Sequence, residues 1–280
     1  MEKIQNLMAA RLGKSELSFE GSRHDRIMQT IEDWNNMSGN LDKEDGYSCD
    51  VCHNKGYIRY CRVERGYPYE YDRPCECQKV RAVLRKMRES GLKNAEEKSF
   101  DRFIAEAPWQ KAVKQAALQY ATDPKGAWFF VGGQTGAGKT HICTAICVEL
   151  MKRHNMGGYY MLWRDEVARL KSIMLEAPDE YAATMKRLKT VDALYIDDLF
   201  KTGKGESPTK GDINLAFEVL NHRYNSSLPT IISSEYTLAE ILDVDEAIGG
   251  RIAEQTHGRF MLSIAKDRSK NYRLKGAIQL

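Results

Sequence analysis

The chain has 280 residues, of which 29% are charged, and its formal net charge at pH 7 is +3. This length suits one α/β domain of ordinary size with a smaller module, and the near-neutral balance means that any nucleic-acid binding has to come from local patches. Apolar runs stay shorter than the ~18 residues of a membrane span, and the first residues lack a signal-peptide pattern, so we expect a cytoplasmic protein.

Two amphipathic helices are expected in residues 1–45. Apolar residues recur at helical spacing, first around residues 4–12 and then around residues 27–34, on either side of a break at Gly21. Such helices can pack internally or dock on a partner, and the sequence leaves that choice open.

Residues 46–77 carry two close cysteine pairs. A Cys-x-x-Cys motif begins the segment, a Cys-x-Cys motif ends it, and the stretch between them is rich in glycine and tyrosine, as in a short hairpin. Four thiolates suit tetrahedral zinc in a reducing compartment, in a segment with too little core to fold alone. Four such ligands leave no position for a catalytic water, and His53 and Cys61 are spare ligands that could replace one of them. The predicted zinc ligands are Cys49, Cys52, Cys75 and Cys77.

Residues 78–93 predict a basic amphipathic helix. Six lysines and arginines stand against a single acid, and the apolar positions form one stripe. The basic face is either a solvated surface or a patch for single-stranded nucleic acid or an acidic partner. We expect the helix to end near Gly91, and the N-terminal helical and zinc-binding domain to span residues 1–95.

The second predicted domain, residues 96–280, is built around a phosphate-binding loop. A buried strand from Trp128 leads into the pattern Gly-x-x-x-x-Gly-Lys-Thr, and an apolar-periodic helix follows. Glycines let successive backbone N–H groups surround a phosphate at the helix N-terminus, where the helix dipole favours an anion. Lys139 then reaches the β- and γ-phosphates, and Thr140 ligates Mg²⁺. The expected nucleotide-binding residues of the loop are Gly133, Gly136, Ala137, Gly138, Lys139, Thr140 and His141.

Strands and helices continue to alternate after this loop. Cys143 and Cys147 are expected in the core as small apolar residues, and the helix 213–224 is expected to bury Leu215, Phe217, Val219 and Leu220. The segment 200–212 is polar and is expected to become ordered on contact with a partner. The other expected elements are a helix over 112–120, strands over 159–163, 193–197 and 228–235, and helices around 167–174 and 181–188.

An acidic motif follows the apolar strand 193–197. Asp197 at the strand end is expected to hold the Mg²⁺ shell, and Asp198 to orient and help deprotonate the attacking water. Asp198 is one methylene shorter than the glutamate of most fast ATPases of this type, so we expect slow turnover. Two later arginines, Arg251 and Arg273, are candidates for contact with the phosphates.

The order of these motifs resembles that of the AAA+ ATPases of the DnaC and DnaI type, the bacterial and phage loaders of the replicative helicase, with the transposition helper IstB as a relative. The resemblance covers residues 46–280, from the cysteine motifs to a terminal Asn-Tyr-Arg. The cysteines and the basic helix are similar to the zinc-bearing N-terminal part of phage and Gram-positive loaders. The resemblance implies an α/β fold in which a central parallel sheet is flanked by helices, preceded by a small helical and zinc-binding domain.

The resemblance also implies a role for each arginine. Arg273 would be the sensor-2 arginine that contacts the nucleotide of its own subunit, and it would act together with Lys139 and Asp198 in catalysis. Arg251 would be the arginine finger that reaches a neighbour's site, where a positive charge stabilises the transferring phosphoryl group. Some relatives carry a second arginine at the place of Gln255, so Arg259 is an alternative finger.

One departure from the family pattern affects the sensing of the γ-phosphate. The asparagine that usually ends the sensor strand is Glu235 here. We therefore expect Ser234, or else Ser233, to contact the phosphate, unless sensing is degraded.

The function that this resemblance implies is ATP-dependent loading of a hexameric replicative helicase. The N-terminal domain would bind the helicase, the AAA+ domain would bind single-stranded DNA, and the subunits would associate into a ring or spiral, with ATP, Mg²⁺ and Zn²⁺ as cofactors. Slow hydrolysis would act as a switch. The alternatives are a transposition helper that polymerises on duplex DNA and a zinc-containing ATP-binding regulator without a DNA role. Candidate DNA contacts are Lys171, Lys186, Arg187 and Lys189.

Overall fold

The computed structural model describes residues 23–274 of the chain. The chain falls into two compact units that meet between Gln78 and Lys79. The first of the two amphipathic helices expected in residues 1–45 lies outside the described residues. Within the described residues, no helix has the length and apolar character that crossing a lipid bilayer requires.

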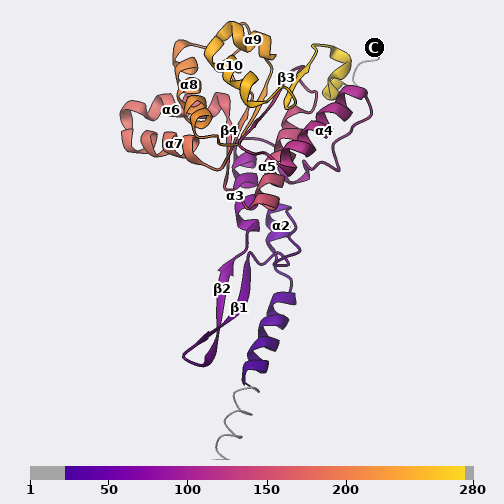
Figure 1. Ribbon diagram of the computed structural model, residues 1–280, viewed down its shortest axis with the longest axis vertical. Coiled ribbons are helices and arrows are strands. Elements are labelled where there is room, and N and C mark those ends of the chain that lie inside the picture. Colours follow the sequence, from indigo (N-terminus) through magenta and orange to yellow (C-terminus); the bar gives the residue numbers. More distant parts are fainter. Residues whose placement is uncertain (1–22, 275–280) are drawn as a thin grey trace, which may run out of the picture. The chain divides into compact units, whose positions relative to one another are not determined.

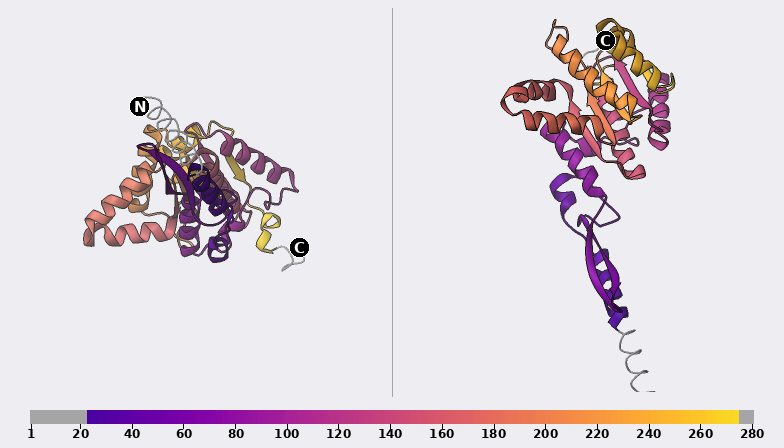
Figure 2. Two further views of the ribbon diagram at one scale, coloured as in Figure 1. Left: turned by 90° about the horizontal axis from the view of Figure 1, so that it is seen from below. Right: turned by 60° about the vertical axis from the view of Figure 1, so that its left-hand side comes forward.

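In its described part, residues 23–78, the first unit contains two helices and a hairpin. Residues 23–36 are helical, and the short helix α2 (Leu41–Asp45) follows them. The strands β1 (Tyr57–Glu64) and β2 (Tyr67–Pro74) pair antiparallel and run alongside the helix 23–36, as the views of Figures 1 and 2 agree. Asn35 fixes this packing, because its side chain donates to the Arg59 carbonyl oxygen at 2.8 Å and accepts from the Arg59 amide at 3.0 Å.

Helix α3 (Cys77–Glu89) begins at the last of the four predicted zinc ligands and belongs mainly to the second unit. Its predicted apolar stripe is buried there, with Leu84 and Met87 almost fully inaccessible. The short 3₁₀ turn η1 (Ala95–Glu97) comes next. The boundary between the compact units thus lies earlier in the chain than the domain boundary that we predicted between residues 95 and 96. The predicted boundary concerns which residues bind which partner, and it stays a prediction.

The second unit is organised around a five-stranded parallel sheet. Its strands are β3 (Trp128–Gly133), β4 (Gly158–Leu162), β5 (Ala193–Asp197), β6 (Thr230–Ser234) and β7 (Met261–Ile264). They lie in the order β4-β5-β6-β3-β7, and every neighbouring pair is parallel. All five carboxyl ends therefore meet at one edge of the sheet, which is where open α/β sheets bind ligands.

Helices cover both faces of this sheet, as expected. Helices α4 and α5 pack together, and α5 lies against β5 and β6 (Figure 1). Helices α6 to α10 share a single apolar core with alternate residues of β3 to β6. The bounds are α4 (Pro108–Thr122), α5 (Lys139–His154), α6 (Trp163–Glu176), α7 (Pro178–Thr190), α8 (Lys210–Asn225), α9 (Leu238–Val244) and α10 (Glu246–Gln255), followed by the 3₁₀ turns η2 (Arg268–Lys270) and η3 (Tyr272–Leu274).

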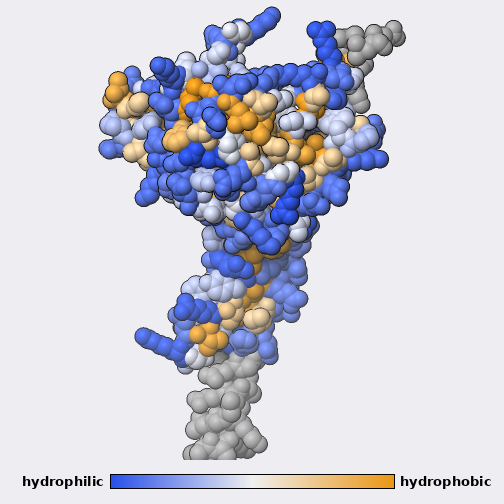
Figure 3. Space-filling model, turned by 45° about the horizontal axis from the view of Figure 1, so that its top comes forward, coloured by the Kyte–Doolittle hydropathy of each residue, from blue (hydrophilic) through white to orange (hydrophobic). Residues whose placement is uncertain are grey.

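Core positions follow the sequence pattern with one exception. Cys143 and Cys147 are fully buried, and burial raises the pKa of the Cys147 thiol to about 12, which keeps it protonated and unreactive. Phe217, which we expected in the core, is 37% exposed. The 3.6-residue repeat places it on the face of α8 opposite Leu215 and Val219. Phe217 is not unusual in this respect, because Figure 3 shows other apolar side chains among the hydrophilic ones on the visible surface.

A buried arginine joins the loops that lead into β5 and β6. Arg223 on α8 is fully buried, and its guanidinium donates to the carbonyl oxygens of Val191 at 2.8 Å and Pro229 at 2.6 Å. It also donates to the Thr230 hydroxyl at 2.9 Å. Burial lowers the pKa of Arg223 to about 10, so the group stays charged at neutral pH. This side chain fixes the start of the two strands that end at the ligand-binding edge.

We predict that Arg223→Ala lowers the free energy of unfolding of the second unit by about 3 kcal/mol or more, because several buried carbonyl oxygens lose their donor. Urea unfolding followed by circular dichroism measures this. Arg164 is an exposed arginine on α6, and Arg164→Ala is the control, with an expected change within about 0.5 kcal/mol. Equal unfolding midpoints for the two variants would contradict the role of Arg223.

Candidate nucleotide and metal sites

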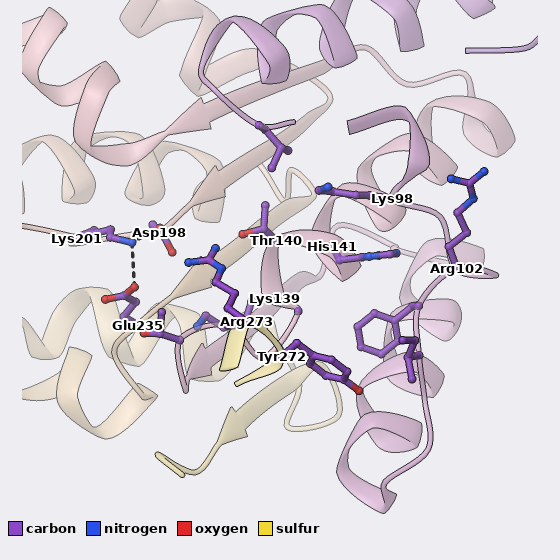
Figure 4. Close-up of a pocket in the computed structure, with 16 residues that line it drawn as sticks. Lys98, Arg102, Lys139, Thr140, His141, Asp198, Lys201, Glu235, Tyr272 and Arg273 are labelled. Atoms are coloured by element: carbon purple, nitrogen blue, oxygen red, sulfur yellow. Dashed lines mark hydrogen bonds and ion pairs between the residues drawn. The ribbon is translucent and has the colours of Figure 1, made fainter. Parts of the chain in front are cut away.

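A cleft of about 470 Å³ opens at the carboxyl edge of the sheet (Figure 4). The phosphate loop and the start of α5 form its floor, and residues that follow β5 and β6 line one end. The segment 92–104 and the C-terminal residues Tyr272 and Arg273 complete the wall. Its size falls in the range of small-molecule sites.

The loop before α5 has the backbone geometry that a phosphate cradle needs. Gly133 has φ +103°, and a Cβ there would lie 2.0 Å from the Ile264 carbonyl oxygen, so only glycine fits. Gly138, with φ +86°, is the N-cap of α5. The Lys139 ammonium donates to the carbonyl oxygens of Gly133 and Gln134 at 2.8 Å each. The loop therefore curls around the lysine at a helix N-terminus, as anion binding requires.

Burial lowers the pKa of Lys139, and the nearby carboxylates of Asp198, Glu235 and Asp197 act in the opposite direction. The cleft therefore holds a desolvated ammonium close to three acids. A bound polyphosphate adds negative charge beside this ammonium and stabilises its protonated form.

Two oxygen ligands for a metal ion meet where Thr140 lines the cleft. The Thr140 hydroxyl donates to Asp197 Oδ1 at 3.2 Å, although the two residues lie on different elements. Asp197 also accepts from the Tyr160 hydroxyl at 3.0 Å and from the Ser233 hydroxyl. Burial raises the pKa of Asp197, and the charge of Asp198 raises it further. Thr140 lines the cleft, whereas Asp197 is buried behind that lining and reaches Thr140 through this hydrogen bond. A carboxylate and a hydroxyl held together in this way fit Mg²⁺, which prefers oxygen ligands.

The residues after β5 and β6 form a charged cluster that the sequence did not reveal. Lys201 donates to Asp198 Oδ2 at 2.8 Å and to Glu235 Oε1 at 2.9 Å, and all three line the cleft (Figure 4). Burial opposes the charge of Lys201, but its bonds to the two acids raise its pKa overall. The predicted base Asp198 is therefore already held in an ion pair, in a left-handed backbone conformation with φ +59°.

The structure does not bring the two predicted sensor serines to the cleft. Ser234 is fully buried, and its hydroxyl donates to the Leu199 carbonyl oxygen at 2.7 Å. Ser233 donates to Asp197 instead. Glu235, the residue that departs from the family pattern, is the one that lines the cleft, because a strand's side chains alternate and the chain turns after Ser234.

The C-terminal segment holds Arg273 over the phosphate loop. The Tyr272 amide donates to the Gly136 carbonyl oxygen at 2.9 Å, and the Tyr272 hydroxyl accepts from Gln110. These contacts place Arg273 in the lining of its own subunit's cleft, the place that the sensor-2 role requires. His141 also lines the cleft, and its Nε2 lies 2.8 Å from the Ser99 carbonyl oxygen.

Sequence reasoning missed Lys98, Arg102 and Phe103, which line the cleft. They lie in an irregular segment without apolar periodicity, so their positions depend on tertiary contacts. The Phe103 ring, for example, packs edge to face against His141, with 5.5 Å between ring centroids.

Arg251 lies away from the cleft of its own subunit. Its guanidinium donates to Asn221 Oδ1 at 2.8 and 3.1 Å and lies 4.8 Å from the centroid of the Phe217 ring. An arginine finger has to point toward a neighbouring subunit, and this position leaves that role a prediction.

Three of the four candidate DNA contacts are engaged in ion pairs or ring contacts, and the fourth, Lys186, is exposed. Lys171 lies 2.7 Å from Asp212, and Lys189 lies 2.6 Å from Glu218. The Arg187 guanidinium lies 4.7 Å from the centroid of the Tyr159 ring. Their pairing reduces the free positive charge that these helices offer to a phosphate backbone.

The four predicted zinc ligands form one buried cluster in the first unit. The sulfur atoms of Cys49, Cys52, Cys75 and Cys77 all lie within 4.8 Å of one another. The Cys49–Cys75 separation is 3.9 Å and the Cys52–Cys77 separation is 3.6 Å. Zn–S bonds of about 2.3 Å in a tetrahedron give S···S edges of about 3.8 Å, so the thiols fit zinc.

The surroundings of the cluster support the same ligand set. The Gly56 amide donates to Cys52 Sγ at 3.3 Å, the kind of outer hydrogen bond that orients a metal ligand. The spare candidates Cys61 and His53 are not members of the cluster. The residues therefore fit Zn²⁺ with the ligands predicted from spacing.

Comparison with known proteins identifies the family to which this sequence is similar. Residues 72–274 match the family described as IstB-like ATP binding protein. The uncharacterized protein YqaM of Bacillus subtilis (strain 168) is 33% identical over 215 residues, 73% of this chain and 67% of YqaM. The phage-like element PBSX protein XkdC of the same organism is 31% identical over 244 residues, 82% of this chain and 87% of XkdC.

One solved structure shows the same fold. The crystal structure of the DnaC helicase loader aligns with a TM-score of 0.50 at 21% identity, covering 62% of this chain and 99% of that chain. At this identity the similarity concerns the fold.

We predict that Lys139→Ala and Asp198→Asn separate binding from chemistry. Lys139→Ala should weaken ATP binding by about tenfold or more, since it removes a charge-assisted hydrogen bond to the phosphates. Asp198→Asn should keep nucleotide affinity and lower kcat by about 10²-fold or more, as loss of a general base does. Fluorescent-nucleotide titration and phosphate release measure the two effects. If Asp198→Asn keeps the full kcat, Asp198 is not the base.

We also predict that Cys52→Ser abolishes stoichiometric zinc and lowers the thermal stability of the first unit, because the cluster loses one of its four thiolates. Cys61→Ser is the matched control and should retain about one zinc per chain. Elemental analysis of the purified variants measures both. Zinc retained by Cys52→Ser and lost by Cys61→Ser would require a different ligand set.

Proposed function

The chain belongs to the IstB-like ATP-binding protein family and is an ATPase, and we propose that it is an ATP-switched loader of a hexameric replicative DNA helicase. The DnaC helicase loader, with which it shares a fold, supports this choice. The observation that carries it is the combination of a cleft built on the phosphate loop and Asp198 with a thiol cluster in a separate N-terminal unit.

In the proposed mechanism, this chain's residues bind and orient ATP. The glycine loop and Lys139 hold the phosphates, Thr140 and Asp197 hold Mg²⁺, and Arg273 contacts the phosphates from the C-terminal side. Magnesium, when bound, neutralises charge on the phosphates. Asp198 orients the attacking water, and it has to leave the ion pair with Lys201 to accept a proton. That competition gives a physical reason for slow turnover.

Each predicted domain has its own partner in this proposal. Residues 1–95 bind the helicase, and residues 96–280 bind ATP and single-stranded DNA. Zinc holds the N-terminal unit in the shape that the helicase recognises. Arg251 of one subunit completes the site of the next, so ATP binding favours a ring or spiral and hydrolysis releases it.

Two other functions compete with the loader. A transposition helper of the IstB kind would polymerise on duplex DNA, and an ATP-binding regulator would bind no DNA. The thiol cluster favours the loader, since the transposition helpers generally lack an N-terminal segment with these cysteines. Binding to duplex DNA without helicase capture would favour the helper.

The proposal is tested by co-purification of the full chain with a hexameric bacterial replicative helicase, with ATP, with ADP and without nucleotide. We expect a complex whose yield depends on the nucleotide. Cys52→Ser should weaken capture, whereas Cys61→Ser should not. A full chain that binds ATP and zinc but captures no helicase under any of these conditions would overturn the loader.

We predict that Arg251→Ala lowers ATPase activity by about tenfold or more, as loss of an arginine finger does. Mixing it with Lys139→Ala should restore part of the activity, because the second variant supplies an intact Arg251 to the first one's intact cleft. Phosphate release across a series of mixing ratios measures this. Activity that simply averages the two variants would exclude a finger in trans.

A further inference from the structure

The two faces of the β1–β2 hairpin differ in composition. Directly paired residues of antiparallel strands lie on the same face, and successive pairs alternate between faces. The register pairs Tyr60 with Tyr71 and Arg62 with Tyr69. One face therefore gathers four tyrosines and two arginines, which we name the tyrosine face: Tyr60, Tyr67, Tyr69, Tyr71, Arg62 and Arg73.

The opposite face packs on the helix 23–36. Arg59 on that face lies 4.6 Å from the centroid of the Trp34 ring, and Asn35 bonds its backbone. Pro68 on the same face is buried. This packing occupies part of that side of the hairpin. On the tyrosine face, the guanidinium of Arg23, from the same helix, lies 5.7 Å from the centroid of the Tyr67 ring and adds positive charge there.

Charge is divided between the two faces. The acids Glu70 and Asp72 lie on the packed face, where Arg59 holds them at 3.3 and 2.9 Å. The tyrosine face carries two arginines against Glu64, which lies 3.5 Å from Arg62. The tyrosine face thus keeps an excess of positive charge, while the negative charge is paired on the other side.

The tyrosine rings are accessible to a ligand. Tyr67 and Tyr69 are 47% and 46% exposed, and Tyr60 is 38% exposed. Tyr60 and Tyr71 lie side by side, with 5.9 Å between centroids and 31° between ring planes. Same-face residues on one strand repeat about every 7 Å, so the rings form a row of surfaces on which flat groups can stack.

We propose that the tyrosine face binds single-stranded nucleic acid. Exposed rings stack on bases, and interleaved arginines pair with phosphates, which is the combination that binds single strands without sequence preference. A duplex hides its base faces and offers the rings nothing to stack on. This site is separate from the ATP cleft and goes beyond the proposed function, which assigns single-stranded DNA to residues 96–280.

The affinity test uses the full chain and fluorescein-labelled oligo(dT) and oligo(U), followed by anisotropy. Tyr60→Ala with Tyr69→Ala should weaken binding by about fivefold or more per ring. Tyr57→Ala is the matched control, since Tyr57, at 47% exposed, is about as accessible as Tyr69 but lies on the face of Arg59. Arg62→Ala with Arg73→Ala should reduce the slope of log affinity against log salt by about 0.7 per arginine. If the tyrosine variants lose affinity for oligo(dT) and oligo(U) equally, the face recognises single strands without using the 2′-hydroxyl. If they lose affinity for only one of the two, that nucleic acid, DNA or RNA, is the ligand of this face.

Cross-linking with 5-iodouracil oligonucleotides places the strand. We expect adducts on tyrosine-face residues, identified by mass spectrometry, while zinc content and ATPase activity of the tyrosine variants match the wild type. Adducts confined to residues 79–280, or unchanged affinity in the double tyrosine variant, would overturn the proposal. Variants that bind oligonucleotide normally but fail to capture the helicase would make this face a protein interface instead. Loss of helicase capture by the whole chain, with oligonucleotide binding intact, would affect only the loader proposal.

Discussion

The structure of the ATP cleft depends on the contact between the Thr140 hydroxyl and the Asp197 carboxylate. The two residues are far apart in sequence: Thr140 follows β3 and Asp197 ends β5, and β6 lies between these two strands. They meet because all strands of the sheet are parallel, so every carboxyl end lies at one edge. Gly133 adds a second constraint, because only glycine fits its backbone beside Ile264. Buried Arg223, which fixes the starts of β5 and β6, supports the same edge from the opposite end of the strands.

The N-terminal unit solves a different physical problem. The elements described in residues 23–78, two helices and a hairpin, bury little apolar surface, and below about 70–80 residues a single core seldom suffices. Four converging thiols at the base of the hairpin, where the Gly56 amide contacts Cys52, offer a metal staple in its place. With such a metal site, one face of the hairpin does not need to be buried in a hydrophobic core. A row of tyrosines can therefore remain exposed on that face.

The motifs that demand a fixed spacing were predictable from the sequence, and the contacts that depend on packing were not. The loop from Gly133 to Thr140 and the four cluster cysteines are local patterns, and the structure brings each set together. Lys201 joins Asp198 to Glu235 across two strand ends, so no local pattern contains it. Phe217 was wrongly placed in the core because its apolar character outweighed its position on the helix. Ser234 was expected at the phosphate, but a buried hydroxyl satisfies the Leu199 carbonyl oxygen first.

The central claim is that Thr140 and Asp197 share one magnesium ion beside phosphates held in the glycine loop. A crystal structure of the full chain soaked with ADP and magnesium measures this most directly. We predict density for the β-phosphate among the loop amides and a metal ion whose shell includes the Thr140 hydroxyl and, directly or through water, the Asp197 carboxylate. Phosphates bound elsewhere, or a metal without either ligand, would contradict the account.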